Sequence, residues 1–258
     1  MLGKHRLICG DATDKTDLLK LMNNKKADMV FTDPPYNVDY SGRGKNNLGK
    51  IKNDKMSENN FDLFINDCFE LIHNNIKPLA TLYICHPDSK SNQKISFEQN
   101  FAKYFIKSCT LIWEKQSAGM GWQDYRSQHE PVLYGWKKGQ GKHIFYGDRT
   151  KTTVWKIKRD AQITYKHPTQ KPVELVKEAI LNSSKEEDIV LEPFLGSGST
   201  IVSAEQTNRI CYGLELDENY CDVIIKRWQD FTGKDATLEN TNKTFKQIQE
   251  ERNGISGT

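Results

Sequence analysis

Short apolar segments alternate with helix-patterned segments along most of the chain, and this alternation limits the folds available to it. Apolar runs typical of strands lie near residues 6–9, 28–32, 79–85, 109–115, 130–136, 152–157, 188–192 and 209–216. Helical patterns separate them at residues 13–22, 60–75, 172–183, 199–207 and 217–231. Such alternation predicts an α/β fold with a mostly parallel sheet and helices on both faces. Residues 109–157 depart from the regular order, and we expect a hairpin there.

The tetrapeptide Asp33-Pro34-Pro35-Tyr36 follows one of these apolar runs and suits chemistry on an exocyclic amine. The lone pair of such an amine is delocalised into the base, so hydrogen-bond acceptors must localise it. The carboxylate of Asp33 can accept one N–H, and the carbonyl of Pro34, held extended by the following proline, can accept the other. Tyr36 offers a flat face for stacking a planar base. The alternative interpretation is that Pro-Pro simply ends a strand beside a half-buried tyrosine.

A glycine-containing turn follows the apolar run at residues 188–192 and precedes a helical pattern. Gly196 and Gly198 let the backbone approach a ligand closely, and the following helix presents unpaired N–H groups. Glu215 ends the next apolar run, 17 residues after Gly198, where an acid characteristically holds ribose hydroxyls. The turn therefore predicts a ligand that contains a nucleoside.

Two other nucleotide-binding motifs do not fit this turn. A P-loop needs a lysine after its last glycine, where Ser199 stands. A dinucleotide fingerprint needs a third glycine where Ile201 stands. S-adenosylmethionine (SAM) fits better, because it has a nucleoside but no pyrophosphate.

The candidate residues follow strands that we expect to run parallel. Asp11, Asp33, Pro193 and Glu215 each lie at or just after the end of an apolar run. The carboxyl ends of parallel strands meet at one edge of a sheet, which is where open α/β sheets bind ligands. Motifs about 160 residues apart can therefore meet at one site.

Four motifs together resemble the DNA methyltransferases that methylate exocyclic amino groups: Gly10-Asp11-Ala12, Asp33-Pro34-Pro35-Tyr36, the glycine turn, and His167-Pro168-Thr169-Gln170-Lys171-Pro172. The tetrapeptide precedes the glycine turn, an order that resembles the circularly permuted beta class. The similarity spans roughly residues 4–232. It implies a Rossmann-like SAM-dependent methyltransferase fold with a terminal antiparallel hairpin. An aspartate in the first position of the tetrapeptide is typical of adenine N6 methylation, whereas serine is commoner in cytosine N4 enzymes.

The resemblance also implies residue roles. Catalysis falls to the tetrapeptide. Glu215 would hold the cofactor's ribose, Asp11 its adenine amino group, and Thr169 with Lys171 its carboxylate. The full set of expected cofactor-binding residues is Asp11, Ala12, Asp33, Thr169, Lys171, Phe194, Gly196, Gly198, Ser199, Thr200 and Glu215. From the residues alone, Asp11 could equally be a helix N-cap and Lys171 a solvated lysine before a helix.

Residues 137–171 concentrate positive charge, with ten Lys and Arg against two Asp, a net charge of +8 in a chain whose formal charge is +3. Aromatic residues lie among them, which suits phosphate contacts and unstacked bases. An exposed basic hairpin over core aromatics is the alternative. The expected DNA-binding residues are Arg43, Lys45, Lys137, Lys138, Lys142, Arg149, Lys151, Lys158 and Arg159. Residues 116–165 are the candidate target-recognition region.

No linker divides the chain, so we expect one methyltransferase domain at residues 1–232 and a polar C-terminal tail at residues 233–258. The six cysteines lack Cys-x-x-Cys spacing, and no His pattern predicts a metal. No apolar stretch reaches the ~20 residues that cross a membrane, and the first residues lack a signal-peptide core. We expect a cytoplasmic protein.

The sequence thus predicts a site-specific DNA methyltransferase that flips adenine out of double-stranded DNA and methylates its N6 with SAM. Alternatives are cytosine N4 methylation, methylation of an amine in RNA or protein, and a non-catalytic subunit. No nuclease motif is evident, so a separate restriction endonuclease would cut the DNA. The resembling class often forms homodimers, for which the sequence holds no independent evidence.

Overall fold

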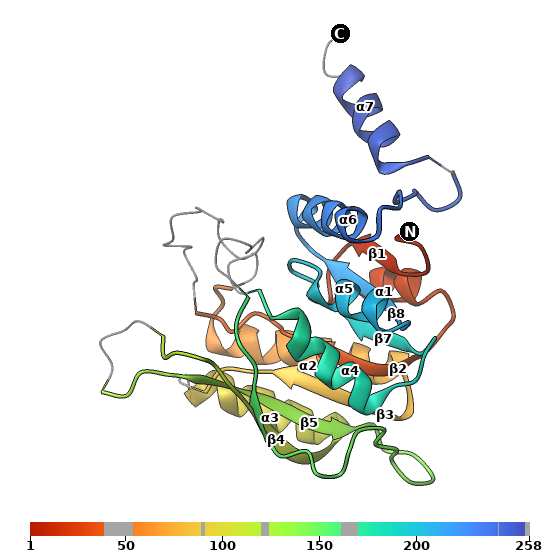
Figure 1. Cartoon of the computed structure of the whole chain (residues 1–258). Helices are drawn as coiled ribbons and strands as arrows, with labels where there is room; N and C mark the ends of the chain where they lie inside the picture. Colours follow the sequence, from red (N-terminus) through yellow and green to blue (C-terminus); the bar gives the residue numbers. More distant parts are fainter. Residues whose placement is uncertain (39–53, 89–90, 120–123, 161–169, 242, 256–258) are drawn as a thin grey trace.

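The computed structural model describes residues 1–38, 54–88, 91–119, 124–160, 170–241 and 243–255. Its centre is an eight-stranded sheet in the order β1-β8-β7-β2-β3-β5-β4-β6 (Figure 1). The strands are β1 (Arg6–Cys9), β2 (Ala27–Thr32), β3 (Ile76–Cys85), β4 (Ile106–Glu114), β5 (His129–Trp136), β6 (Val154–Lys156), β7 (Ile189–Glu192) and β8 (Ile210–Glu215). Each overlaps a strand expected from the apolar runs.

Strand direction decides which residues share an edge of the sheet. β1, β8, β7, β2 and β3 are parallel neighbours, whereas β5 is antiparallel to both β3 and β4. β6 is parallel to β4, so among the strands of the described residues β5 alone runs against the others. The expected hairpin is confirmed as β4 and β5. The amino end of β5 therefore lies at the same edge as the carboxyl ends of the other strands.

Helices cover both faces of the sheet (Figure 1). They are α1 (Lys15–Met22), α2 (Glu58–Asn75), α3 (Ser91–Tyr104), α4 (Val173–Ser183), α5 (Ser199–Gln206), α6 (Glu218–Thr232) and α7 (Phe245–Ile255). One apolar core packs under α1, α2 and α3 and includes Val30 of β2. A second packs under α4, α5 and α6 and includes Met29 and Phe31. Adjacent β2 residues thus point to opposite faces, and the strand is buried on both sides, as its continuous apolar run predicts.

Helix α3 was not predicted from the sequence. Its surface is largely polar, but Phe97 and Phe101 are fully buried and lie four residues apart, on one face of the helix. Both contact Phe69 of α2, with ring centroids 6.1 and 6.4 Å apart. Two buried aromatics in fourteen residues are too sparse a pattern to identify a helix by periodicity alone.

The polar tail is partly attached to the domain. Ala236 is buried, the amino terminus donates to the Thr237 carbonyl at 2.6 Å, and Arg6 forms an ion pair with Glu239. Helix α7 then extends away from the sheet (Figure 1). In the described part of the chain, no helix is both long enough and apolar enough to cross a membrane.

Candidate active site

The tetrapeptide lies directly beyond β2, at the carboxyl edge of the sheet. Thr32 ends β2 fully buried, and Asp33 follows it with 17% of its side chain exposed. The Tyr36 hydroxyl donates to Oδ1 of Asp33 at 2.7 Å. The Tyr36 ring meets Phe97 edge to face, with centroids 6.2 Å apart. This contact and the hydrogen bond fix the tyrosine beside the carboxylate.

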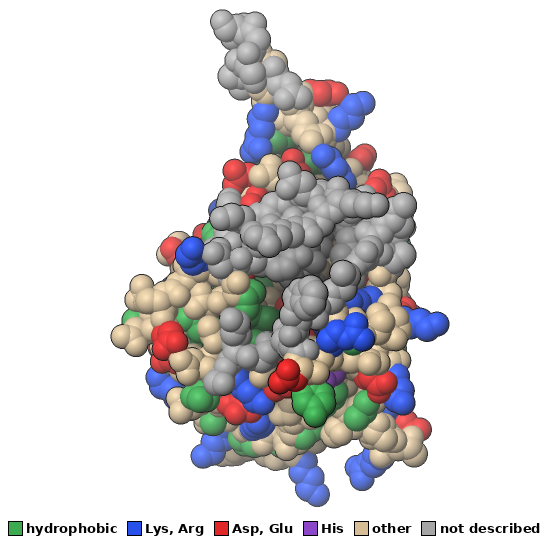
Figure 2. Space-filling view, turned by 90° about the vertical axis from the view of Figure 1, so that its left-hand side faces the viewer, with side chains coloured by type: hydrophobic (Ala, Val, Ile, Leu, Met, Phe, Trp, Pro, Cys, Tyr) green, Lys and Arg blue, Asp and Glu red, His purple; other side chains and the backbone are tan. Residues whose placement is uncertain are grey.

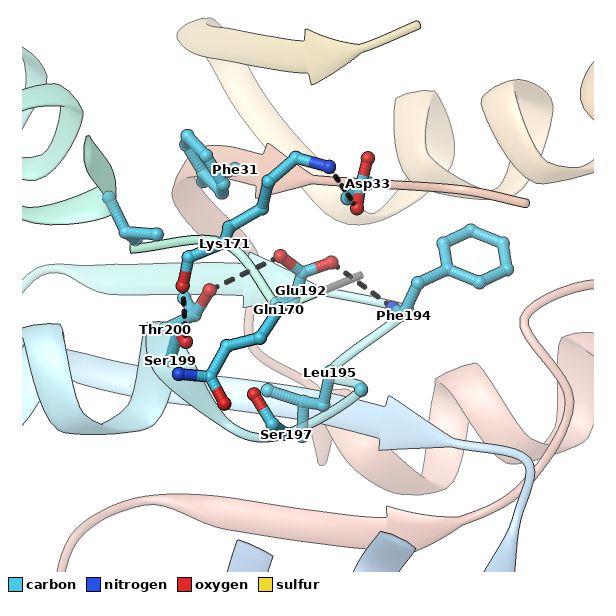
Figure 3. A pocket seen from close by; sticks show the side chains of 12 residues that line it. Phe31, Asp33, Gln170, Lys171, Glu192, Phe194, Leu195, Ser197, Ser199 and Thr200 are labelled. Carbon is cyan, nitrogen blue, oxygen red and sulfur yellow. Dashed lines mark hydrogen bonds and ion pairs between the residues drawn. The ribbon is translucent and has the colours of Figure 1, made fainter. Parts of the chain in front are cut away.

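Lys171 approaches the same carboxylate from the segment that precedes α4. Its Nζ lies 2.5 Å from Oδ2 of Asp33 and 3.1 Å from Oε2 of Glu130, and 5.5 Å from the centre of the Tyr36 ring. Figure 3 shows the lysine side chain directed at Asp33. Burial alone would lower the pKa of Lys171, but the two carboxylates outweigh it and raise that pKa. Lys171 therefore stays protonated.

Glu130 and Lys115 extend this contact into a row of alternating charges. Lys115 forms an ion pair with Oε1 of Glu130, and its own side chain is 9% exposed. Burial would raise the pKa of Glu130, but Lys171 and then Lys115 outweigh it and lower that pKa to about 2. Glu130 is therefore ionised, and the row reads Asp33, Lys171, Glu130, Lys115.

The glycine turn faces this charged row across a pocket. Gly196 and Gly198 have φ angles of +53° and +79°, in the left-handed region that favours glycine. Ser199, the first residue of α5, donates its hydroxyl to the Lys171 carbonyl at 2.7 Å. The turn is thus attached to the segment that carries Lys171 (Figure 3).

Glu192 holds the glycine turn in place through two hydrogen bonds. It ends β7, is 3% exposed, and accepts from the Phe194 N–H at 3.1 Å and the Thr200 hydroxyl at 3.2 Å (Figure 3). Burial raises the pKa of Glu192 well above its usual value. Burial therefore favours the protonated form of this carboxyl.

Glu215, at the end of β8, joins the turn to the loop before α6. Its Oε2 accepts from the Gly196 N–H at 2.8 Å, and its Oε1 accepts from the Asp217 N–H at 2.9 Å. Its carbonyl accepts from the Gly10 N–H at 3.0 Å, which places Asp11 on the neighbouring strand end. Asp11 itself accepts from the N–H and hydroxyl of Thr13. Burial raises the pKa of Glu215.

A pocket collects residues from three of the four motifs. Its walls are Phe31, Asp33, Gln170, Lys171, Val176, Glu192, Phe194, Leu195, Gly196, Ser197, Ser199 and Thr200. Six expected cofactor-binding residues are among them, including both Asp33 and Lys171. Asp11, Ala12 and Glu215 lie along the same sheet edge outside this lining, with Gly198 in the turn itself. Thr169 lies outside the described residues.

The expected DNA-binding residues are not brought together. Lys137 follows the carboxyl end of β5, which lies at the sheet edge opposite Asp33 because β5 is antiparallel, and its Nζ donates to the carbonyls of His73 and Ile76. Lys138 and Lys142 follow it, and Lys151 forms an ion pair with Glu178 of α4. Arg149 precedes Lys151 in the same connection. This part of the basic segment does not border the pocket.

Lys158 and Arg159 lie nearer the site. They follow β6, whose carboxyl end is at the Asp33 edge, and the Arg159 N–H donates to the Gln116 side chain at 2.8 Å. Arg43 and Lys45 lie outside the described residues. On the face in Figure 2, basic side chains of the described residues are interleaved with acidic ones. Within the described residues of the segment, the positive charge is therefore divided between the two edges of the sheet.

Three charged residues of the site were missed from the sequence. Glu192 lies inside the turn motif but reads as part of an apolar strand. Lys115 follows β4 directly, so the rule that selected Asp33 could have found it. Glu130 lies near the start of an apolar run, and only the antiparallel direction of β5 brings it to the site.

The fold and the site define a Rossmann-like α/β protein with a nucleoside-type turn and an acid-led tetrapeptide at one sheet edge. A family model described as DNA methylase matches residues 27–227. DNA adenine methyltransferase YhdJ of Escherichia coli (strain K12) is 30% identical over 257 residues, covering 86% of this chain and 81% of that protein. Type II methyltransferase M.HpaI of Haemophilus parainfluenzae is 28% identical, covering 91% and 77%.

Solved structures agree on the fold. The crystal structure of the M1.HpyAVI–SAM complex gives a TM-score of 0.64 at 23% identity, covering 86% of this chain and 98% of that one. PvuII DNA methyltransferase, described as cytosine-N4-specific, gives 0.65 at 14% identity, covering 98% and 93%. The chain belongs to the DNA methylase family and is a DNA methyltransferase. The resemblance to DNA amino-methyltransferases and the Rossmann-like methyltransferase fold are both confirmed, and the beta class stays a prediction.

Proposed function

We propose that this enzyme transfers a methyl group from SAM to the exocyclic N6 of adenine in double-stranded DNA. The observation that carries the proposal is that Asp33, which accepts a hydrogen bond from Tyr36, lines one pocket together with the glycine turn. YhdJ, the relative that is 30% identical, is named as an adenine methyltransferase, which supports the choice of base. The aspartate that leads the tetrapeptide supports the same choice.

The residues present fit SAM. Gly196 and Gly198 leave the backbone of the turn free of side chains, and the Glu215 carboxylate lies at the neighbouring strand end where a ribose would bind. Phe194 and Thr200 line the pocket between the turn and Asp33. When bound, SAM supplies an electrophilic methyl on a sulfonium, so this chain's residues need only bind and orient the amine.

The target adenine leaves the base stack, because its amine is otherwise paired within the duplex. Tyr36 stacks on the flipped base. Asp33 and the carbonyl of Pro34 accept its two N–H groups, which localises the nitrogen lone pair toward the methyl. Proximity then supplies much of the acceleration, since well-oriented reactions reach effective molarities of about 10⁵–10⁸ M. Lys158 and Arg159, which follow β6 at the Asp33 edge of the sheet, would contact the duplex backbone.

Labelled methyl transfer from SAM to unmethylated double-stranded DNA tests the proposal. The wild type is expected to label DNA, and Asp33→Ala is expected to label none while it still binds SAM. Turnover by Asp33→Ala at the wild-type rate would refute the role of Asp33. Label on RNA but not on DNA would instead favour an RNA amine as the substrate.

We also propose a cytoplasmic enzyme that serves a restriction-modification system, with cleavage by a separate endonuclease and with a homodimer as its assembled form. The name of M.HpaI as a type II methyltransferase supports a role in a restriction-modification system. The six free cysteines, four of them buried, are compatible with a reducing compartment. Sedimentation of the purified chain tests the homodimer.

A further inference from the structure

Both oxygens of the Asp33 carboxylate are already engaged. Oδ1 accepts from the Tyr36 hydroxyl at 2.7 Å, and Oδ2 lies 2.5 Å from the Lys171 ammonium. A cation this close draws electron density from the acceptor and opposes positive charge near it. Methyl transfer to an amine places positive charge on the nitrogen that Asp33 must hold. Lys171 in this position therefore works against the proposed reaction.

Glu130 offers the same ammonium a second carboxylate. Glu130 belongs to β5, and its Oε2 lies 3.1 Å from the Lys171 Nζ. A lysine side chain has rotatable bonds, and a small movement would exchange its shorter contact with Asp33 for a shorter contact with Glu130. The lysine remains paired in either position.

Lys115 holds the Glu130 carboxylate in place beside Lys171. Its ammonium contacts Oε1 of Glu130, so Oε2 alone is directed to Lys171. Two further contacts hold Lys115 itself. Its Nζ lies 5.1 Å from the centre of the Trp113 ring, and its backbone N–H donates to the Gln128 carbonyl. Glu130, on β5, is thereby held by the residue that directly follows β4.

We propose that Glu130 is a positioning residue that receives the Lys171 ammonium when the target amine binds, and so frees Asp33 to accept the amine N–H. This inference rests on the proposed function. Glu130 is not among the residues that line the pocket with Asp33, and it acts through Lys171. The β4–β5 hairpin thus contributes a positioning residue to the reaction.

Glu130→Gln tests the inference, because it keeps the shape of the side chain and removes the charge that attracts Lys171. We expect kcat to fall at least about tenfold, with KM for DNA and for SAM within about threefold of the wild type. Glu130→Asp, which restores a carboxylate, is expected to recover part of kcat. Glu114→Gln is the matched control, since Glu114 lies on the same hairpin in an exposed ion pair with Lys156, and its kcat should equal that of the wild type.

The double variant Glu130→Gln/Lys115→Met separates positioning from folding. Removal of Lys115 takes away the buried ammonium that Glu130→Gln leaves unpaired, so the melting temperature should return toward that of the wild type. The inference predicts that kcat stays low in this variant. Recovery of kcat together with the melting temperature would show that Glu130 only maintains the fold and would overturn the inference.

Three further outcomes are decisive. A wild-type kcat in folded Glu130→Gln overturns the inference and leaves the proposed function intact. A rise in KM for DNA at constant kcat also overturns it, because Glu130 would then contact the substrate. Absence of methyl transfer by the wild type itself refutes the proposed function and the inference with it.

Discussion

The Nζ of Lys171 lies 2.5 Å from Oδ2 of Asp33, across 138 residues of sequence. Two motifs that the sequence assigns to different tasks, one catalytic and one for the cofactor carboxylate, therefore meet in a single ion pair. Burial raises the pKa of Asp33, and Lys171 is the strongest group that acts against this rise. The lysine thus lowers the pKa of the acid on which the proposed reaction depends, against the larger effect of burial.

Lys171→Met should move the acidic limb of the kcat/KM profile, which reports the free enzyme, to higher pH. Without the lysine, burial is less opposed, the pKa of Asp33 rises further, and the acid is ionised only at higher pH. The measurement is kcat/KM for DNA from about pH 5 to pH 9, with the partly exposed Lys177→Met on α4 as the control. An unmoved acidic limb would show that Lys171 does not set the ionisation of Asp33. A rise in KM for SAM alone would support only the carboxylate-binding role expected from the sequence.

Tyr36→Phe and Tyr36→Ala should differ in size of effect. Phenylalanine keeps the ring but loses the hydroxyl that donates to Asp33, a hydrogen bond to a charged acceptor worth about 1.5–3 kcal/mol. Alanine also loses base stacking, worth roughly 1–3 kcal/mol. We expect kcat/KM for DNA to fall about tenfold in the first variant and about a hundredfold or more in the second. Equal losses in both would argue against stacking on Tyr36.

Glu215→Gln should weaken SAM binding at least about tenfold. The carboxylate holds the N–H groups of Gly196 and Asp217, and the proposal also assigns it the ribose hydroxyls. Calorimetric titration of SAM measures the loss, with the exposed Glu174→Gln as the matched control. Unchanged affinity would show that Glu215 does not bind the cofactor and serves only to hold the N–H groups of Gly196 and Asp217.

Glu192→Gln should gain stability relative to the wild type as pH rises. The folded state raises the pKa of this buried acid, so the folded protein binds a proton that the unfolded chain releases above about pH 4.3. The wild type therefore loses stability with increasing pH, until the folded-state pKa is passed, and the glutamine variant lacks this loss. Melting temperatures of both proteins across pH measure it. A constant difference between them at every pH would mean that folding does not shift the pKa of Glu192.

Much of the fold follows from periodicity, because each strand of the sheet overlaps a short apolar run of the sequence. Helix α3 could not be predicted from periodicity, because Phe97 and Phe101 pack on α2 while the rest of its surface is largely polar. At the site, Asp33 and Glu215 could be found because parallel strands end at one edge. Glu130 could not, because the direction of β5 is a property of the assembled sheet.

The basic segment, residues 137–171, is a second case in which the sequence does not predict where residues lie in the folded protein. A net charge of +8 is evident from the sequence, but the path of the chain sends Lys137 to the edge opposite Asp33 and returns Arg159 to the near edge. Charge counted along a sequence therefore predicts an affinity for nucleic acid and not the surface that binds it.

The most direct test is nucleoside analysis of double-stranded DNA after incubation with the enzyme and methyl-labelled SAM. The account predicts that the label is recovered in N6-methyladenine and is lost in Asp33→Ala. Label in N4-methylcytosine would keep the mechanism and contradict the choice of base. Absence of label in either nucleoside, with SAM binding intact, would contradict the account as a whole.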